Sequence, residues 1–586
     1  MKSSRYIYVC AVALSAFGAQ AQDLQREVTV DREIEPATRM ATRMSGVTPT
    51  PYVPKLRLTP LKSAEYSGRG TLTRTLTRLE PAAYADTFDV SPYKGYVSAG
   101  YFPTYNLGVS AGYSLLSSRD TRLGVFLQYD GESHHGFRTL LPDGDDKSLT
   151  AALHLATVGF DAGHRFNKTN AIDMSMSYSY GATTTPLAAL LKTQGQSANI
   201  VDLTIGYHNT GRVSWNVGFD LDYLGYGKKQ IIPVAGLSPQ EKFKPIKQSV
   251  IALTGDVTFS NFNIALDASV ANLNHRATLL PAPSLNGATD SYNALLGEGS
   301  LSTGIIMLTP SYKINREKWG LQLGLNVAWV VNDPDNHIHL SPAVRWDWAP
   351  ASAFSLWIKA GGGDAPTRFN ELYHQSPWMP SVYSYTSTYA PVIADAGINI
   401  GPWNGFSAEL FGGYAVVNNA LMPYIVDGTA LYRATDMRGA HYGVKLSYDW
   451  QDKVTASLGV EGASHGDYDK GYYLWADRAK YHLDASVTAR PVSALEVTLA
   501  YKLATSRRSW ILTSASTDVL PIAWYEANDY MTLGNIADLS VEGRYSFSPE
   551  LSVFGRVGNL LCRRHIDISL VASQRINGLV GVNYKF

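Results

Sequence analysis

Histidine pairs and one acidic stretch are the residues whose type and spacing come closest to metal chemistry. His134 and His135 are adjacent, and His337 and His339 flank one isoleucine. Imidazole is a ligand of transition metals, but a zinc site uses three or four ligands and neither pair has a third one placed beside it. The acidic stretch 143–146 resembles half of a calcium loop, without the spaced ligands and the final glutamate. The sequence therefore predicts surface histidines and no metal site.

A catalytic nucleophile with a base beside it is not recognisable in the sequence. No Gly-x-Ser-x-Gly elbow occurs. Cys10 lies in an amino-terminal apolar run that we expect to be removed, which leaves Cys562 alone and predicts that no intramolecular disulfide forms. Cys562 lies at the outer end of a predicted strand, where we expect it to pack. We therefore expect a protein that is not an enzyme and that holds no cofactor.

Aromatic side chains in two predicted outer loops have the character of a binding surface. Tyrosine and tryptophan give a large contact area together with a polar group, and loops on a rigid scaffold often carry function. The residues are Trp378, Tyr383, Tyr385 and Tyr389 in the loop at 374–391, and Tyr472, Tyr473 and Trp475 in the loop at 467–475. Two interpretations stay open: contact with a ligand, and packing of each loop onto its neighbours.

The segments that would position these loops alternate apolar and polar residues with a period of two. Between Ile172 and Tyr180, apolar residues and tyrosines alternate with aspartate and serine, and the same alternation returns at 262–270, 442–450 and 454–461. Repeated down the chain, this pattern is typical of a transmembrane β-barrel that is apolar outside and polar inside. The count is about 22 strands, beginning near residues 93, 106, 122, 148, 171, 198, 213, 249, 262, 300, 319, 337, 354, 390, 405, 440, 453, 480, 495, 536, 551 and 577.

Connection lengths give a second, independent indication of the same fold. Connections after even-numbered strands are short, as at 167–170 and 401–404, whereas several after odd-numbered strands are long, as at 363–389 and 504–535. Outer-membrane barrels have short periplasmic turns and long outer loops. The sequence therefore predicts an all-β, antiparallel transmembrane barrel over 93–586, with both of its ends at the periplasmic rim.

The amino terminus and the composition fit an exported membrane protein. Lys2 and Arg5 precede an apolar run at 6–17 and a small-x-small pattern at 19–21, which predicts a signal peptide over 1–21. Charged residues make up only 17% of the chain, with 36 tyrosines and 50 glycines, as suits a wall that faces lipid on one side. The formal net charge is zero, so the overall balance gives no argument for a nucleic-acid partner.

Three stretches resemble the barrels of TonB-dependent receptors. The stretch 364–373 is similar to the family's Ala-Pro-x-x-x-Glu-Leu-Tyr, and 554–561 is similar to its late Asn-Leu-Phe-Asn motif. The ending at 578–586 matches the family's closing strand, and its terminal Phe586 resembles the signal read by the barrel-assembly machinery. The resemblance implies a 22-stranded receptor barrel in the outer membrane.

The segment 22–92 departs from that family, because it carries no recognisable plug motifs. Glu27, Val28, Thr29 and Val30 faintly resemble a TonB box, the short strand offered to the energy-coupling partner. Between residues 39 and 79 the segment has eight basic residues against Glu65 alone, and several prolines keep it from forming a long helix. The inward positions of the predicted strands include Asp267, Glu461, Asp484, Glu496 and Glu542, so we expect an acidic lumen. Two interpretations of the segment stay open: a solvated periplasmic tail, and an extended basic segment that fills the lumen.

Two functions follow from this sequence. The first is a TonB-dependent receptor-like transporter or channel of the outer membrane, for uptake or export of an unidentified substrate. The alternative is a barrel that transports nothing and serves as a docking or assembly platform for envelope proteins. The expected partners are outer-membrane lipids and the barrel-assembly machinery, together with TonB in the first case or surface lipoproteins in the second.

Overall fold

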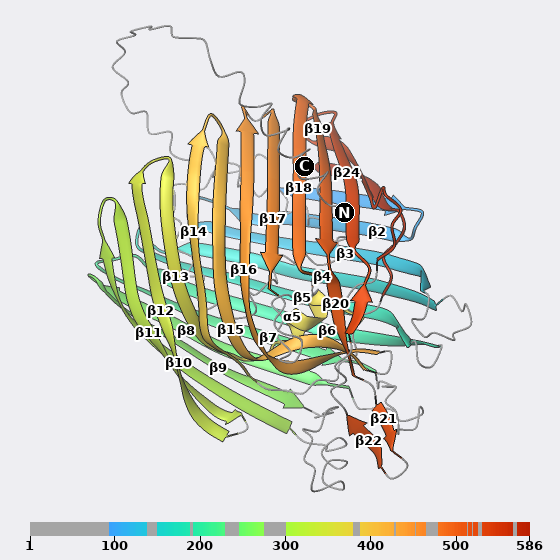
Figure 1. The fold of residues 1–586 in the computed structure, drawn as a ribbon. Helices are drawn as coiled ribbons and strands as arrows, with labels where there is room; N and C mark the ends of the chain where they lie inside the picture. Colours follow the sequence, from blue (N-terminus) through green and yellow to red (C-terminus); the bar gives the residue numbers. More distant parts are fainter. Residues whose placement is uncertain are drawn as a thin grey trace, which may run out of the picture. The chain divides into compact units, whose positions relative to one another are not determined.

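The computed structural model of the chain is a β-barrel, with one short helix among the residues that it describes (Figure 1). The structure describes residues 93–137, 149–187, 192–228, 245–274, 300–333, 335–378, 387–426, 429–451, 453–464, 479–512, 514–517, 520–524, 530–565 and 571–586. The expected signal peptide, the segment 22–92 and the TonB-box-like residues lie outside the described residues. Among the described residues, no helix is long and apolar enough to cross a membrane.

Twenty-two antiparallel strands form the wall of the barrel, which confirms the predicted fold class and strand number. They are β1 (Gly95–Phe102), β2 (Asn106–Ser117), β3 (Thr121–Phe137), β4 (Leu149–Arg165), β5 (Asn170–Leu187), β6 (Lys192–Asn209), β7 (Val213–Tyr226), β8 (Lys247–Phe259), β9 (Phe262–Asn274), β10 (Ser300–Asn315), β11 (Trp319–Asp333), β12 (Asp335–Ala351), β13 (Phe354–Ala365), β14 (Thr388–Trp403), β15 (Phe406–Val426), β16 (Thr429–Trp450), β17 (Val454–Ala463), β18 (Tyr481–Val492), β19 (Leu495–Thr505), β24 (Ile536–Ser546), β25 (Leu551–Gly558) and β26 (Asn577–Lys585).

Four shorter strands belong to the long connection between β19 and β24. They are β20 (Arg507–Leu512), β21 (Ser514–Thr517), β22 (Leu520–Trp524) and β23 (Tyr530–Leu533). β20 pairs with β23, and β21 pairs with β22 in a small sheet of its own. β16 starts at Thr429, earlier than the predicted start near 440, because β15 and β16 continue as a paired hairpin to Val426 and Thr429. Tertiary pairing thus extends these strands beyond the alternating segment.

The first and last strands pair with each other and close the barrel. β1 and β26 run antiparallel, with Tyr96 opposite Lys585 and Tyr101 opposite Val580. At the chain end the Gly95 backbone N–H donates to the Phe586 carbonyl at 2.9 Å, and the Phe586 N–H donates to the Gly95 carbonyl at 3.0 Å. The Phe586 ring stacks on Tyr113 of β2, with ring centroids 6.2 Å apart. The terminal residue therefore takes part in the seam itself.

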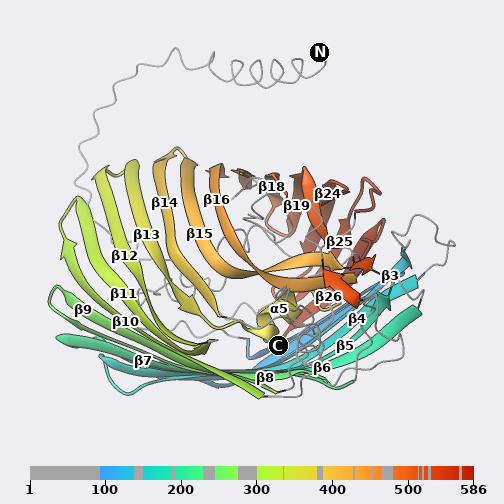
Figure 2. The same cartoon turned by 60° about the horizontal axis from the view of Figure 1, so that its bottom comes forward.

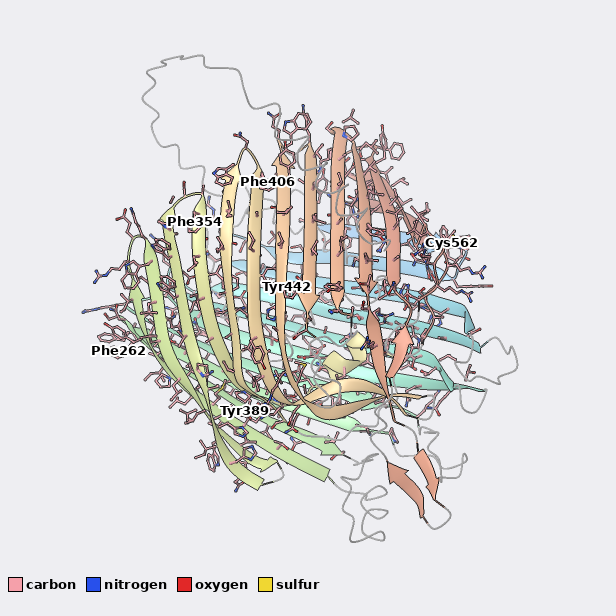
Figure 3. All side chains as sticks on the ribbon, viewed as in Figure 1. Phe262, Phe354, Tyr389, Phe406, Tyr442 and Cys562 are labelled. Atoms are coloured by element: carbon pink, nitrogen blue, oxygen red, sulfur yellow. The ribbon has the colours of Figure 1, made fainter. Side chains whose placement is uncertain are left out.

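The outward face carries the apolar side chains that the alternation predicts. Leu266 of β9 is 38% exposed on that face, whereas Asn263 and Ser269, on the opposite face of the same strand, are buried. Phe262 and Tyr442, both labelled in Figure 3, are likewise exposed aromatic residues of the wall. Asp267 lies on the same face of β9 as Asn263 and Ser269, so its predicted inward position is confirmed.

Exposed tryptophans mark the two edges of the apolar band. Trp319 and Trp329 lie on the outward face of β11, ten residues apart. At about 3.3 Å per residue and a tilt of about 40°, ten residues span about 25 Å along the membrane normal, the height of the apolar band in such barrels. Trp450 at the end of β16 is also exposed. These positions suit interfacial anchors.

The connections follow the predicted rhythm of short and long. β12 and β13 are joined by two residues, and so are β14 and β15, beside Phe354 and Phe406 in Figure 3. In the turn between β4 and β5, Asn167 Oδ1 accepts the backbone N–H groups of Thr169 and Asn170, both at 2.9 Å. Such side-chain turns need few residues. As in other outer-membrane barrels, we expect the rim with the short turns to be the periplasmic one and the long connections to lie at the outer one.

Leu266→Arg is predicted to reduce assembly far more than Asp267→Arg. An arginine on the lipid face near the bilayer midplane costs about 2–4 kcal/mol, whereas one in the lumen stays hydrated. The measurement is the fraction of heat-modifiable, folded barrel in outer membranes by cold gel electrophoresis. Equal losses in the two variants would contradict the register of β9.

Candidate functional site

The connection between β13 and β14 turns into the lumen. Its helix α5 (Phe369–Gln375) lies inside the ring of strands in both Figure 1 and Figure 2. The contacts of residues 364–378 reach inward-facing groups of β3 to β8, which lie across the barrel from the strands that carry it. We call residues 364–378 the lumenal strap. It contains the whole stretch that resembles the receptor motif.

Two glycines let the chain leave the wall at the root of the strap. Gly363 has φ +131°, a conformation that residues with a side chain rarely adopt. A Cβ on Gly362 would meet the Ala390 carbonyl and lie 2.7 Å from the Ser341 Cβ. The register between β13 and β14 shifts between Gly361 and Gly363. The absence of side chains here therefore permits the bend that sends the strap inward.

A buried ion pair ties the strap to β7. The Arg368 guanidinium contacts the Asp222 carboxylate, and their side chains are 12% and 9% exposed. Arg368 Nε also lies 4.0 Å from Glu371 Oε1 in the first turn of α5. Removal of one partner from such a buried pair leaves an uncompensated charge and costs about 3–5 kcal/mol. The pair thus holds the strap at one position along the wall.

Side-chain amides add hydrogen bonds on either side of that ion pair. Gln248 of β8 donates from Nε2 to the Thr367 carbonyl at 2.7 Å and accepts the Phe369 backbone N–H at 2.8 Å. Asn370 Nδ2 donates to Asp202 Oδ1 of β6 at 2.8 Å. Three neighbouring strands therefore each present one polar side chain to the strap. This arrangement gives hydrogen-bond partners to buried polar groups at the start of α5.

Tyr373 and Phe369 give the strap its apolar contacts. Both are buried, and the Tyr373 hydroxyl occupies the space that a side chain on Gly181 of β5 would need. The Tyr373 ring lies edge-on to Tyr226 of β7, with centroids 6.2 Å apart. Burial raises the pKa of Tyr373, so its phenol stays neutral. A glycine in the wall and an aromatic ring in the strap therefore fit together.

Trp378 fixes the far end of the strap. Its ring stands edge-on to His134 of β3, with centroids 5.1 Å apart, and its Nε1 donates to the Ala152 carbonyl of β4 at 3.3 Å. It packs in a buried cluster with Ala151 and Val571. Val571 belongs to the connection between β25 and β26. The two connections therefore meet at Trp378.

The β25–β26 connection covers the outer ends of β1 to β3. Asn559, at φ +51°, donates from Nδ2 to the carbonyls of Arg563 and Gln574, both at 2.8 Å. Gln574 Nε2 reaches the Ser133 carbonyl and Asn106 Oδ1 in the wall. Asn559 is the asparagine of the second stretch that resembles the receptor family. Both resembling stretches thus form the roots of connections that fold back onto the barrel.

The aromatic residues proposed as ligand contacts lie in different surroundings. Trp378 is buried in the contacts just described, which agrees with the interpretation that it packs the loop onto its neighbours. Tyr389 lies in β14 and not in a loop, where its ring stacks on His339 at 3.7 Å and its hydroxyl donates to the Leu340 carbonyl at 2.8 Å. Residues Tyr383, Tyr385, Tyr472, Tyr473 and Trp475 lie outside the described residues. Ligand contact by any of these residues stays a prediction.

Two other expectations are corrected. Cys562 does not pack: it is exposed, in the turn after β25, at φ +53° (labelled in Figure 3). The expectation of an acidic lumen is also wrong where carboxylates have basic neighbours in the register. Asp484, Glu496 and Glu542 stand opposite Lys502, Arg544 and Arg556 on the next strand. Charge in this part of the wall is balanced across strands.

The polar anchors of the strap were missed by sequence reasoning. Asp222, Gln248 and Asp202 lie on three strands and look like ordinary inward residues of a polar wall. The one available signal was the stretch 364–373, which we interpreted as a mark of resemblance and not as a lumenal element. Only the fold brings these residues within hydrogen-bonding distance of it.

Solved structures share this barrel at low sequence identity. The siderophore receptor PirA from Acinetobacter baumannii matches with a TM-score of 0.59 and 10% identity, over 84% of this chain and 80% of its own. The FrpB iron transporter from Neisseria meningitidis matches with a TM-score of 0.59 and 12% identity, over 85% and 82%. A mutant of the ferric enterobactin receptor PfeA from Pseudomonas aeruginosa gives 0.58 and 12%, over 84% and 80%.

The barrel has the fold of the TonB-dependent receptors of the outer membrane. This confirms the resemblance at the level of fold. No family model matches the chain, and no curated protein matches it by sequence. The barrel described here thus shares its architecture, but very little of its sequence, with those neighbours.

Gly181→Ala is predicted to displace the lumenal strap and to raise the conductance of the barrel. The new methyl group would take the place of the Tyr373 hydroxyl, so the Tyr373 ring must leave its site on the wall and the strap loses its main aromatic contact there. The measurement is single-channel conductance of the purified barrel in planar bilayers. Gly124→Ala is the matched control, because a Cβ there meets only the Tyr113 carbonyl at 3.9 Å. Identical conductance in both variants and the parent would contradict a strap that restricts the lumen.

Docking of the β25–β26 connection is predicted to weaken as the pH falls. Burial, helped by Arg507 and His134, lowers the pKa of His565 from 6.5 to about 4. The neutral ring is therefore favoured when docked, so its contribution is complete above pH 6.5 and is lost as the pH falls toward 4. At about 1.4 kcal/mol per pKa unit, this amounts to about 3 kcal/mol.

The measurement is amide hydrogen exchange of the connection at pH 7 and pH 4, corrected for the intrinsic pH dependence of exchange. In His565→Gln the residual pH effect should be much smaller. A parent protein with no loss of protection at pH 4 would contradict the assigned cause.

Proposed function

We propose that this chain is a receptor-like transporter that takes up a ferric chelate across the outer membrane. The observation that carries the proposal is the 22-stranded receptor barrel, shared with a siderophore receptor, an iron transporter and a ferric enterobactin receptor. The alternative, a docking platform that transports nothing, is not favoured by these neighbours. The lumenal strap supports the proposal as well, since an element that is docked on the wall through side-chain contacts, and not through strand pairing, can be released.

Energy coupling through TonB is part of the proposal. A substrate that must pass a lumen containing a strap needs a change inside the barrel, and Glu27, Val28, Thr29 and Val30 are the residues that resemble the coupling strand. A strand that pairs with a partner uses its backbone N–H groups. Proline at position 28 would remove one of them and break the pairing.

Uptake is predicted to depend on position 28, whereas binding is not. The test expresses the chain in a Gram-negative host without its own ferric enterobactin receptors and follows radioactive iron supplied as ferric enterobactin, with ferrichrome as a second probe. The parent chain should support uptake of at least one probe. Val28→Pro should bind that probe at the cell surface but lose uptake by at least about tenfold, and Val28→Ile is the control.

Surface binding that resists Val28→Pro together with unchanged uptake would remove energy coupling from the proposal. Neither binding nor uptake of either chelate, with the barrel assembled, would remove the ferric-chelate substrate class.

A further inference from the structure

Two histidines of β12 project from the same face of the strand into the lumen. His337 and His339 are two residues apart, and their neighbours Ile338 and Leu340 are 68% and 55% exposed on the lipid-facing side. Alternation therefore turns both imidazoles inward. The two rings lie with their centroids 4.3 Å apart. This is the spacing at which two imidazoles on one strand can share one ion.

The third ligand comes from the neighbouring strand β13. The Asp364 side chain is fully buried, and its Oδ1 lies 2.7 Å from His339 Nδ1. One ligand atom from each of His337, His339 and Asp364 lies within 4.8 Å of the other two. The sequence lacked this information, because Asp364 is 25 residues from His339 along the chain. The fold thus supplies the third ligand that the His337 and His339 pair lacks in the nearby sequence.

The distances are close to those that a metal ion requires. Ligand atoms at about 2.0–2.1 Å from a tetrahedral zinc ion lie about 3.3 Å from one another. The 2.7 Å between His339 and Asp364 would open by about 0.6 Å, and the atoms of the wider pairs would approach by no more than about 1.5 Å. Side-chain rotation provides shifts of this size without movement of the strands.

Neighbouring groups already hold the ligands in place. The Tyr389 ring stacks on His339 with an angle of 12° between the planes, and its hydroxyl is fixed on the Leu340 carbonyl. Ligands whose orientation is set by surrounding contacts bind metals more tightly than free ones. His337 and His339 are both only partly buried, so the lumen has access to the cluster.

We propose that His337, His339 and Asp364 bind one divalent first-row transition-metal ion at the lumenal wall. Two imidazole nitrogens and one carboxylate suit zinc, nickel, copper or ferrous iron, whereas calcium and magnesium prefer oxygen ligands alone. Three protein ligands leave a coordination position open toward the lumen. The ion would cross-link β12 to the root of the strap, which begins at Asp364. The site does not depend on the substrate proposed above.

Zinc binding to the purified full-length barrel tests the proposal. The protein carries no histidine tag, is stripped of metal in detergent, and is titrated with zinc and separately with magnesium by calorimetry at pH 7.5. One zinc ion per barrel and no magnesium binding are expected. His337→Ala, His339→Ala and Asp364→Asn should each weaken zinc binding by more than about 100-fold, since loss of a ligand exceeds the effect of a supporting contact.

His208→Ala is the matched control. His208 faces a carboxylate as well, with Nε2 3.8 Å from Asp173 Oδ2, but it is not part of the three-residue cluster. This variant should bind zinc as the parent does. X-ray absorption at the zinc edge gives a second measurement, with imidazole scattering expected in the parent and reduced in His339→Ala. Heat modifiability of each variant on gels shows that the barrel has folded.

Three outcomes would overturn the proposal. One is the absence of a stoichiometric zinc site in the parent barrel. Another is zinc binding that survives all three ligand substitutions, which would place the ion elsewhere. The last is an equal loss of zinc binding in His208→Ala.

Discussion

Closure of the wall by β1 and β26 is the constraint on which the rest of the structure depends. In hydrocarbon each unsatisfied backbone N–H or C=O costs several kcal/mol, so an open sheet edge is not tolerated. The pairing of the first strand with the last removes both edges at once and brings Phe586 onto the amino-terminal strand. Every other strand then has two neighbours, and the outward apolar face and the inward polar face follow from the alternation of side chains.

The lumen of this closed barrel contains an ordered element of the chain itself. The lumenal strap leaves the wall at Gly362 and Gly363 and reaches strands on the opposite side through Arg368 and Trp378. The wall provides complementary features at each contact: a carboxylate on β7, an amide on β8 and a missing side chain on β5. The strap is thus a docked element, held by specific polar and aromatic contacts with the wall.

In the wall from β13 to β16 and from β18 to β25, charge balance between strands limits what can bind there through electrostatics alone. Carboxylates of the wall face lysines and arginines on adjacent strands, as Glu409 does with Lys445 at 3.6 Å and Asp395 with Lys359 at 3.0 Å. In these strands a general attraction for a basic segment is therefore weaker than the sequence indicated, whereas β6 and β7 place Asp202 opposite Asp222. Recognition inside this barrel must come from particular clusters, of which the imidazole and carboxylate group beside Tyr389 is one.

The sequence by itself determined the barrel, the strand number and the face of each strand that is turned outward. Each of these follows from patterns within single strands and turns, such as the alternation around Leu266 or the two-residue turn beside Phe354. Such patterns can be recognised without knowing which segments are neighbours in space. Only the tertiary structure decided where the connections go. Arg368 meets Asp222, and His339 meets Asp364, because strand pairing and barrel closure bring distant segments together. No local period encodes contacts across a lumen, so both clusters had to be found in the fold.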